Sequence, residues 1–141
     1  MSTEHSRNER SYRTHSERLL LYLARDLFFG VRIRDTASRA GWACLALAPD
    51  DDAAAVISRS RPNVVLVDLQ ADTARWQALV AAARHCPTGS IPCVAFGSHM
   101  DLDARAQALR AGATTVVANS QLASNLTGLL ERYASPAATS P

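Results

Sequence analysis

Short apolar runs alternate with longer segments of helical periodicity along most of the chain. Five such runs are of strand length and are almost entirely apolar; they cover residues 19–23, 43–47, 63–67, 93–96 and 115–118. Runs of this length without a polar face are typical of parallel strands that are buried on both sides. After each run, apolar residues recur every three or four positions, which predicts a helix.

The ends of the predicted helices are marked by residues that favour them. Four helical patterns begin after aspartates that can accept a hydrogen bond from the first turn; these are Asp26, Asp50–Asp52, Asp72 and Asp101. Glycine or proline ends the same four patterns, at Gly41, Pro62, Pro87 and Gly112. Five strand–helix units with right-handed crossovers predict an α/β fold, in which a doubly wound parallel sheet forms the middle of three layers.

Polar segments flank this alternating pattern. Residues 1–17 are rich in Ser, Arg, Glu, His and Asn, and Tyr12 is their only large apolar residue after Met1. Such a segment buries too little surface to order itself, so we expect a flexible N-terminal arm. By the same argument we expect a disordered tail over residues 134–141. A single folded domain is therefore predicted over residues 18–133.

Composition indicates a soluble domain in a reducing compartment. The chain has 141 residues, of which 48% are hydrophobic, and no apolar run approaches the roughly 18 residues of a membrane helix. A net charge of +2 from scattered positive residues argues against a nucleic-acid surface. Two of the three cysteines, Cys44 and Cys93, lie inside apolar runs, and the polar N-terminus does not resemble a signal peptide. We therefore expect a cytoplasmic protein with neither membrane nor nucleic acid as a partner.

All 15 basic residues of the chain are arginine. Any mechanism that requires the amine of a lysine is therefore excluded. Arginine is not a free substitute, because its guanidinium is planar, permanently charged and suited to paired hydrogen bonds with carboxylates.

Candidate functional residues lie where the predicted strands end, because doubly wound folds bind ligands beyond the carboxyl ends of their strands. The residues at these ends are Arg25, Asp26, Asp68, Gly97, Ser98, His99 and Asn119. The chain has no G-x-G-x-x-G or P-loop motif, and no C-x-x-C or H-E-x-x-H spacing. We therefore expect no cofactor and no bound metal.

Three segments together resemble the receiver domain of bacterial response regulators, over about residues 18–133. RPNVVLVDLQ resembles the third strand with its phosphoacceptor aspartate, which would be Asp68. SIPCVAFGS resembles the fourth strand, and RAGATTVVANS resembles the fifth strand with the turn that leads into it. The resemblance implies a flavodoxin-like sheet with strand order 2-1-3-4-5.

The same resemblance implies the loss of most phosphorylation groups. Receivers hold magnesium with an acidic pair after the first strand, and they carry a hydroxyl after the fourth strand and a lysine after the fifth. In this chain the acidic pair falls on Ala24 and Arg25, and Asp26 lies one position late. Gly97 stands at the hydroxyl position, with Ser98 one later, and Asn119 stands at the lysine position.

An arginine beside a lone aspartate changes the expected chemistry. A divalent cation prefers several oxygen ligands, and a guanidinium in the same cleft repels it. An ion pair between Arg25 and Asp68 would satisfy both charges without any metal. We therefore expect a pseudo-receiver in which Asp68 is retained but is not phosphorylated by the usual magnesium-dependent route. Asp26 is expected to cap the first helix, unless the alignment shifts by one residue and makes it a metal ligand.

From the resemblance and the altered site we expect a non-catalytic signalling module that binds an unidentified protein partner. Receivers signal through their fourth helix, fifth strand and fifth helix. The corresponding face here would include Leu102, Leu109, Val116 and Leu126, and it could also support a homodimer.

Two alternatives remain open from the sequence. The first is a stand-alone response regulator that is phosphorylated on Asp68. The second is a small-molecule sensor or enzyme that uses a cleft formed by Asp68, Ser98 and His99. Against the second, adjacent serine and histidine side chains rarely point at one another, and no G-x-S-x-G motif is present.

Overall fold

The computed structural model describes residues 18–134 of the chain. The expected arm at residues 1–17 and all but the first residue of the expected tail lie outside the described part.

A five-stranded parallel sheet forms the centre of the molecule. Its strands are β1 (Arg18–Leu23), β2 (Trp42–Ala46), β3 (Val64–Asp68), β4 (Cys93–Gly97) and β5 (Thr115–Ala118). They lie in the order β2-β1-β3-β4-β5, and every neighbouring pair is parallel. This confirms the predicted strand order and the doubly wound topology.

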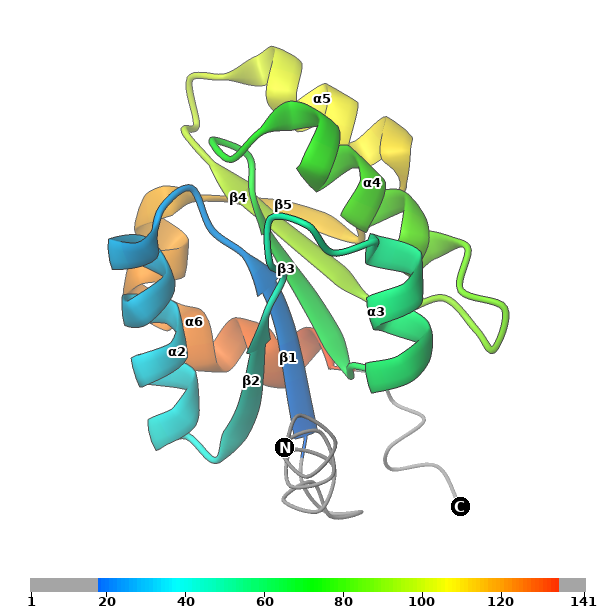
Figure 1. Cartoon of the computed structure of the whole chain (residues 1–141). Coiled ribbons are helices and arrows are strands. Elements are labelled where there is room, and N and C mark those ends of the chain that lie inside the picture. The colour runs from blue at the N-terminus through cyan, green and yellow to red at the C-terminus, as the bar shows by residue number, and fades with distance from the viewer. Residues whose placement is uncertain (1–17, 135–141) are drawn as a thin grey trace.

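Five helices cover the two faces of the sheet (Figure 1). They are α2 (Leu27–Arg39), α3 (Ala53–Ser60), α4 (Thr73–Arg84), α5 (Leu102–Ala111) and α6 (Asn119–Tyr133). Helices α3, α4 and α5 lie on one face, and α2 and α6 lie on the other. The three-layer arrangement is therefore as predicted. No helix of the described part is long and apolar enough to span a membrane.

Each face of the sheet has its own hydrophobic cluster. The first cluster lies beneath α3, α4 and α5 and contains the fully buried side chains of Trp76 and Leu79. The second cluster lies beneath α2 and α6 and contains Phe96 and Leu130. Strands β3 and β4 contribute residues to both clusters in alternation, because successive strand side chains point to opposite faces.

Four of the five helices begin at an aspartate whose carboxylate accepts a hydrogen bond from the backbone N–H three residues later. The pairs are Asp26 with Phe29, Asp52 with Ala55, Asp72 with Arg75 and Asp101 with Ala104, at 2.8–3.2 Å. This confirms the predicted helix starts. All four carboxylates lie on the edge where the strands end, which is also the edge that carries Asp68.

Some strand bounds and one surface assignment need correction. The second strand lies at residues 42–46 rather than 43–47, because Trp42 pairs with Arg18 and its ring packs in the second cluster. The third strand lies at residues 64–68 rather than 63–67, because its pairing with β1 begins at Val64 and Asp68 pairs with Phe96. Strands β1 and β4 are each one residue longer than expected. Leu126, expected on an interaction face, is only 6% exposed. It lies on the apolar stripe of α6 that packs against the sheet, so its assignment to an interaction surface is wrong.

Candidate functional site

Asp68 is the only charged residue among those fully buried in the described part, and it ends β3 at the centre of the sheet. Arg25 follows the end of β1, and β1 is the neighbour of β3 in the sheet. Asn119 follows the end of β5. The parallel topology therefore brings these three side chains to one edge of the sheet.

The carboxylate of Asp68 accepts three hydrogen bonds. Its Oδ2 atom accepts from the backbone N–H of Arg25 at 2.8 Å and from Nε of the same residue at 2.7 Å. Its Oδ1 atom accepts from the backbone N–H of Gln70 at 2.9 Å. The ion pair expected from the sequence is thus present, and it compensates a carboxylate that is 0% exposed.

Arg25 also contacts two groups that hold its guanidinium in place. One terminal nitrogen donates to Oδ1 of Asn119 at 3.3 Å. The guanidinium lies 4.2 Å from the centroid of the Phe29 ring, and that ring stacks on Phe96 at 5.6 Å between centroids. A cation over an aromatic face is stabilised by the ring quadrupole. Arg25 therefore joins the ends of β1, β3 and β5 through one side chain.

The other cleft residues predicted from the sequence do not form hydrogen bonds with the Asp68 carboxylate. The carboxylate of Asp26 accepts from Phe29 N–H and caps α2, so its predicted role as a cap is observed. The hydroxyl of Ser98 accepts from the backbone N–H of Met100 at 3.1 Å, and His99 is exposed. Gly97 is buried, and a Cβ at this position would lie 3.2 Å from Cβ of Leu69. Within residues 18–134, the hydrogen bonds to the carboxylate of Asp68 come from Arg25 and Gln70.

Metal-ligating side chains do not converge in the described part of the chain, where no group of three or more His, Cys, Asp or Glu residues could hold an ion. The positive charge beside Asp68 is supplied by the protein itself. The site is therefore a closed ion pair, in which both oxygens of the carboxylate are already occupied by donors.

The surroundings of Cys93 and Cys44 disfavour the thiolate form that a nucleophile needs. Burial raises the pKa of the Cys93 thiol to about 12, so this thiol stays protonated at neutral pH and acts as a core side chain. Burial also raises the pKa of Cys44, although a hydrogen bond with Ser38 and the charge of Arg34 act in the opposite direction.

Comparisons of the structure identify proteins of similar fold, whereas comparisons of the sequence find no match. No family model matches the chain, and no curated protein matches its sequence. Among solved structures, it is similar to chemotaxis protein CheY4 of Vibrio cholerae, with a TM-score of 0.70 and 17% identity, covering 83% of this chain and 98% of that one. It is also similar to NtrX of Brucella abortus, with a TM-score of 0.65 and 20% identity over 82% of this chain, which spans 26% of NtrX.

A third similar structure is a response regulator of Burkholderia pseudomallei that contains a phosphorylated aspartic acid, a calcium ion and citrate. Its TM-score is 0.66 at 16% identity, and the match covers 86% of this chain and 69% of that one. The three matches cover more than four-fifths of this chain, so residues 18–134 have the fold of a response-regulator receiver domain.

Proposed function

We propose that this chain is a receiver-like signalling module that acts by binding another protein and is not switched by magnesium-dependent phosphorylation. The observation that carries the proposal is the state of Asp68, whose buried carboxylate is already held by three donors, one of them the Arg25 guanidinium.

The electrostatics of the ion pair support this proposal. A divalent cation at Asp68 would face the Arg25 guanidinium at close range, and a hard cation needs several oxygen ligands that the neighbouring positions do not offer. Moving Arg25 aside would leave its hydrogen bonds to Asp68 and Asn119 unmade. Breaking one partner from a buried pair costs more than the pair itself contributes.

Stabilisation of an incoming phosphoryl group would also be weak. Phosphoryl transfer depends mainly on positive charge placed around the transferred group. Asn119 is neutral, and its side-chain oxygen already accepts from Arg25. Arg25 could supply positive charge to a phosphoryl group on Asp68, but its Nε already donates a hydrogen bond to the Asp68 carboxylate.

Helix α5 offers an interaction surface for the proposed module. Its inward face consists of alanines, with Ala108 fully buried, while Leu102 and Leu109 are 70% and 53% exposed. Leu126 is excluded from this surface by its burial, and Val116 is half-buried against the first cluster. We propose that the two exposed leucines contact the protein partner or a second copy of the chain.

Metal and beryllofluoride titrations test the first part of the proposal. We expect no saturable change in Trp42 or Trp76 emission when magnesium and then beryllofluoride are added, and no acid-labile phosphate after treatment with acetyl phosphate. Arg25→Asp is the matched comparison, because it removes the cation and places a second carboxylate beside Asp68. We expect this variant to gain a saturable response to magnesium. A saturable response of the natural chain to both additions, abolished by Asp68→Asn, would instead favour the phosphorylated regulator.

The interaction surface is tested with charge substitutions on two helices. We expect Leu102→Asp with Leu109→Asp to abolish any dimer seen by sedimentation equilibrium and any complex that the tagged chain forms in cells. Leu27→Asp on α2 is the control, because this leucine is also highly exposed. Equal loss of association in both variants would refute the assignment to α5.

A further inference from the structure

Arginines gather on the edge of the sheet opposite to Asp68. Every helix carries one in its last turn, and these residues are Arg39, Arg59, Arg84, Arg110 and Arg132. Because all helices run antiparallel to the strands, their last turns lie at the amino edge of the sheet. The aspartate caps lie at the other edge, so the charge of the molecule is polarised along the strand direction.

Three of these arginines end helices that pack side by side on one face of the sheet. Helix α4 packs between α3 and α5, so Arg59, Arg84 and Arg110 end three adjacent helices. All three are exposed, and none forms an ion pair within residues 18–134. Segments 53–67, 73–100 and 104–130 contain no Asp or Glu. We call these three residues the amino-edge strip.

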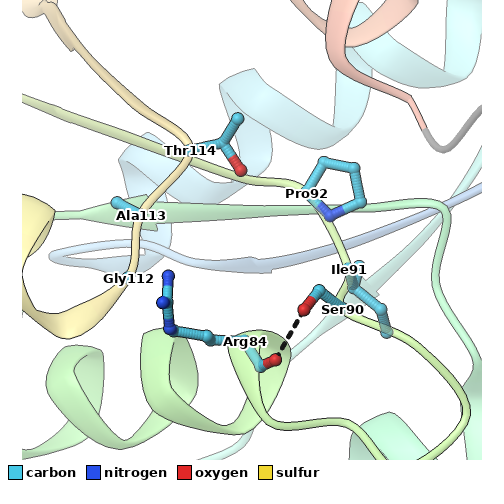
Figure 2. A pocket seen from close by; sticks show the side chains of 7 residues that line it. All are labelled: Arg84, Ser90, Ile91, Pro92, Gly112, Ala113 and Thr114. Carbon is cyan, nitrogen blue, oxygen red and sulfur yellow. Dashed lines mark hydrogen bonds between the residues drawn. The ribbon is translucent and has the colours of Figure 1, made fainter.

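A pocket of about 260 Å³ adjoins the strip at Arg84 (Figure 2). It lies between the end of α4, the segment that enters β4 and the turn that enters β5. Figure 2 shows the Arg84 side chain pointing toward the turn at Gly112, which has a φ of +117°. A Cβ at Gly112 would overlap Cδ of Arg84, so the glycine makes room for the arginine stem.

The walls of the pocket supply both donors and apolar surface. The hydroxyl of Thr114 accepts from Cys93 N–H at 2.9 Å and keeps its own proton available for donation. The hydroxyl of Ser90 donates to the carbonyl of Arg84 at 2.7 Å, which fixes this loop against the helix end. Ile91 and Pro92 add apolar surface. A guanidinium, a hydroxyl and an apolar wall suit a side chain with a carboxylate and a short aliphatic stem.

The helix dipole explains only part of this arrangement. A positive side chain in the last turn stabilises any helix, and Arg39 and Arg132 serve that role on the other layer. Those two also have partners inside the protein, since Arg39 pairs with Asp35 at 3.0 Å and Arg132 lies over the Tyr133 ring. Among residues 18–134 the amino-edge strip has no such partners, and it adjoins a pocket at Arg84.

We propose that the amino-edge strip and its pocket bind an acidic segment of a partner protein, with one carboxylate held by Arg84 and Thr114. Arginine forks pair with carboxylates through two parallel hydrogen bonds. Neither the strip nor the pocket lining contains an aromatic ring on which a nucleic-acid base could stack. The site is separate from the Asp68 ion pair and does not depend on whether Asp68 is phosphorylated.

Binding of fluorescein-labelled octaglutamate to the full chain, measured by anisotropy at low ionic strength, tests the proposal. We expect Arg84→Gln with Arg110→Gln to weaken binding about tenfold, which is the loss of two exposed charge pairs. Arg39→Gln with Arg132→Gln is the matched control, because it removes the same charge from the same helix position on the other layer. It should change the affinity less than about twofold. Amide resonances of Gly112 and Thr114 should shift on addition of octaglutamate.

Four results would overturn the proposal. If octaglutamine bound as tightly as octaglutamate, the strip would not be a specific site for carboxylates. The same conclusion would follow if both double variants weakened binding equally. Tighter binding of an oligothymidine of equal charge through Arg84 and Arg110 would assign the strip to nucleic acid. Self-association at low salt that the same two substitutions abolish would assign it to a second copy of the chain.

Discussion

The buried carboxylate of Asp68 requires a compensating charge, and this chain supplies it from a side chain. The Arg25 side chain remains 24% exposed, so the pair is partly screened by solvent. Two backbone N–H groups share the carboxylate and would remain after a substitution of Arg25. The contribution of the guanidinium to stability should therefore be smaller than that of a fully buried ion pair.

Arg25→Met tests that contribution, because methionine keeps an apolar stem against Phe29 and removes the charge. We expect the free energy of unfolding in urea to fall by about 1–3 kcal/mol, below the range for fully buried pairs. Asp68→Asn in the same background should recover part of the loss, because it removes the uncompensated carboxylate. A loss under about 0.5 kcal/mol would mean that the pair is structurally neutral.

Cys93 gives a prediction at alkaline pH. Its pKa is raised to about 12 in the folded protein, from an ordinary value of 9.0, so only the unfolded chain loses this proton between those values. The thiol therefore contributes stability that is fully present below pH 9 and is lost as the pH rises toward 12. We expect a slope of about −1.4 kcal/mol per pH unit from this group.

Comparing the natural chain with Cys93→Ala isolates that slope, since every other ionisable group is common to both proteins. The variant should lose less stability than the natural chain on going from pH 9 to pH 11, whatever its stability at neutral pH. Parallel curves for the two proteins would show that Cys93 does not cause the loss.

At the scale of elements, helix starts depend on single carboxylates. Asp101 caps α5 through a hydrogen bond to Ala104 N–H, whereas Asp103 lies in the first turn as a charge alone. We expect Asp101→Ala to lower the free energy of unfolding by about 1 kcal/mol and Asp101→Asn by much less, because asparagine retains the acceptor. Asp103→Ala should have less than half the effect of Asp101→Ala in the same denaturation measurement. If the two alanine variants were equal, charge rather than the cap would start the helix.

The end of α5 depends on a glycine for two separable reasons. Gly112 has a positive φ and also faces the stem of Arg84, whereas Gly89 has a positive φ with open space around it. Replacement of either by alanine should cost about 1–2 kcal/mol of backbone strain. Gly112→Ala should cost more, and adding Arg84→Ala should remove the excess. An unchanged loss in that double variant would leave strain as the sole cause.

Local signals in the sequence were sufficient for most of the elements. The apolar runs, the aspartate caps and the terminating glycines act over a few residues, so they predict strands and helices without knowledge of the tertiary structure. The strand order was implied by the receiver resemblance, and the observed sheet agrees with it. The one-residue errors in β2 and β3 arose because Trp42 packs in the core at the start of β2 and because Asp68 extends β3 beside Phe96.

The candidate site was only partly predictable. The pairing of Arg25 with Asp68 follows from two opposite charges at neighbouring strand ends. The contribution of Phe29 and Phe96 depends on the rotation of α2, which leaves Phe28 exposed and turns Phe29 inward. For Leu126 the signal was present, since it belongs to the apolar stripe of α6. The receiver resemblance places Leu126 on an exposed face, whereas the stripe places it in the core.

For the whole molecule, the two hydrophobic clusters are joined through one sheet. Strands β3 and β4 supply side chains to both, so loss of packing on one face should weaken the other. The two tryptophans report the clusters separately, because Trp76 lies in the first and Trp42 in the second. Two-state unfolding of a domain of this size would make both probes change together.

Leu130→Ala provides the test when it is placed in two single-tryptophan backgrounds, Trp42→Phe and Trp76→Phe. Leu130 is fully buried in the second cluster, so its truncation should cost about 2–5 kcal/mol. We expect the urea midpoint to shift equally whether Trp76 or Trp42 is observed, and Leu79→Ala in the first cluster should behave likewise. A shift confined to the tryptophan of the substituted cluster would mean that the two faces unfold independently, so that the sheet does not couple the Asp68 edge to both helical layers.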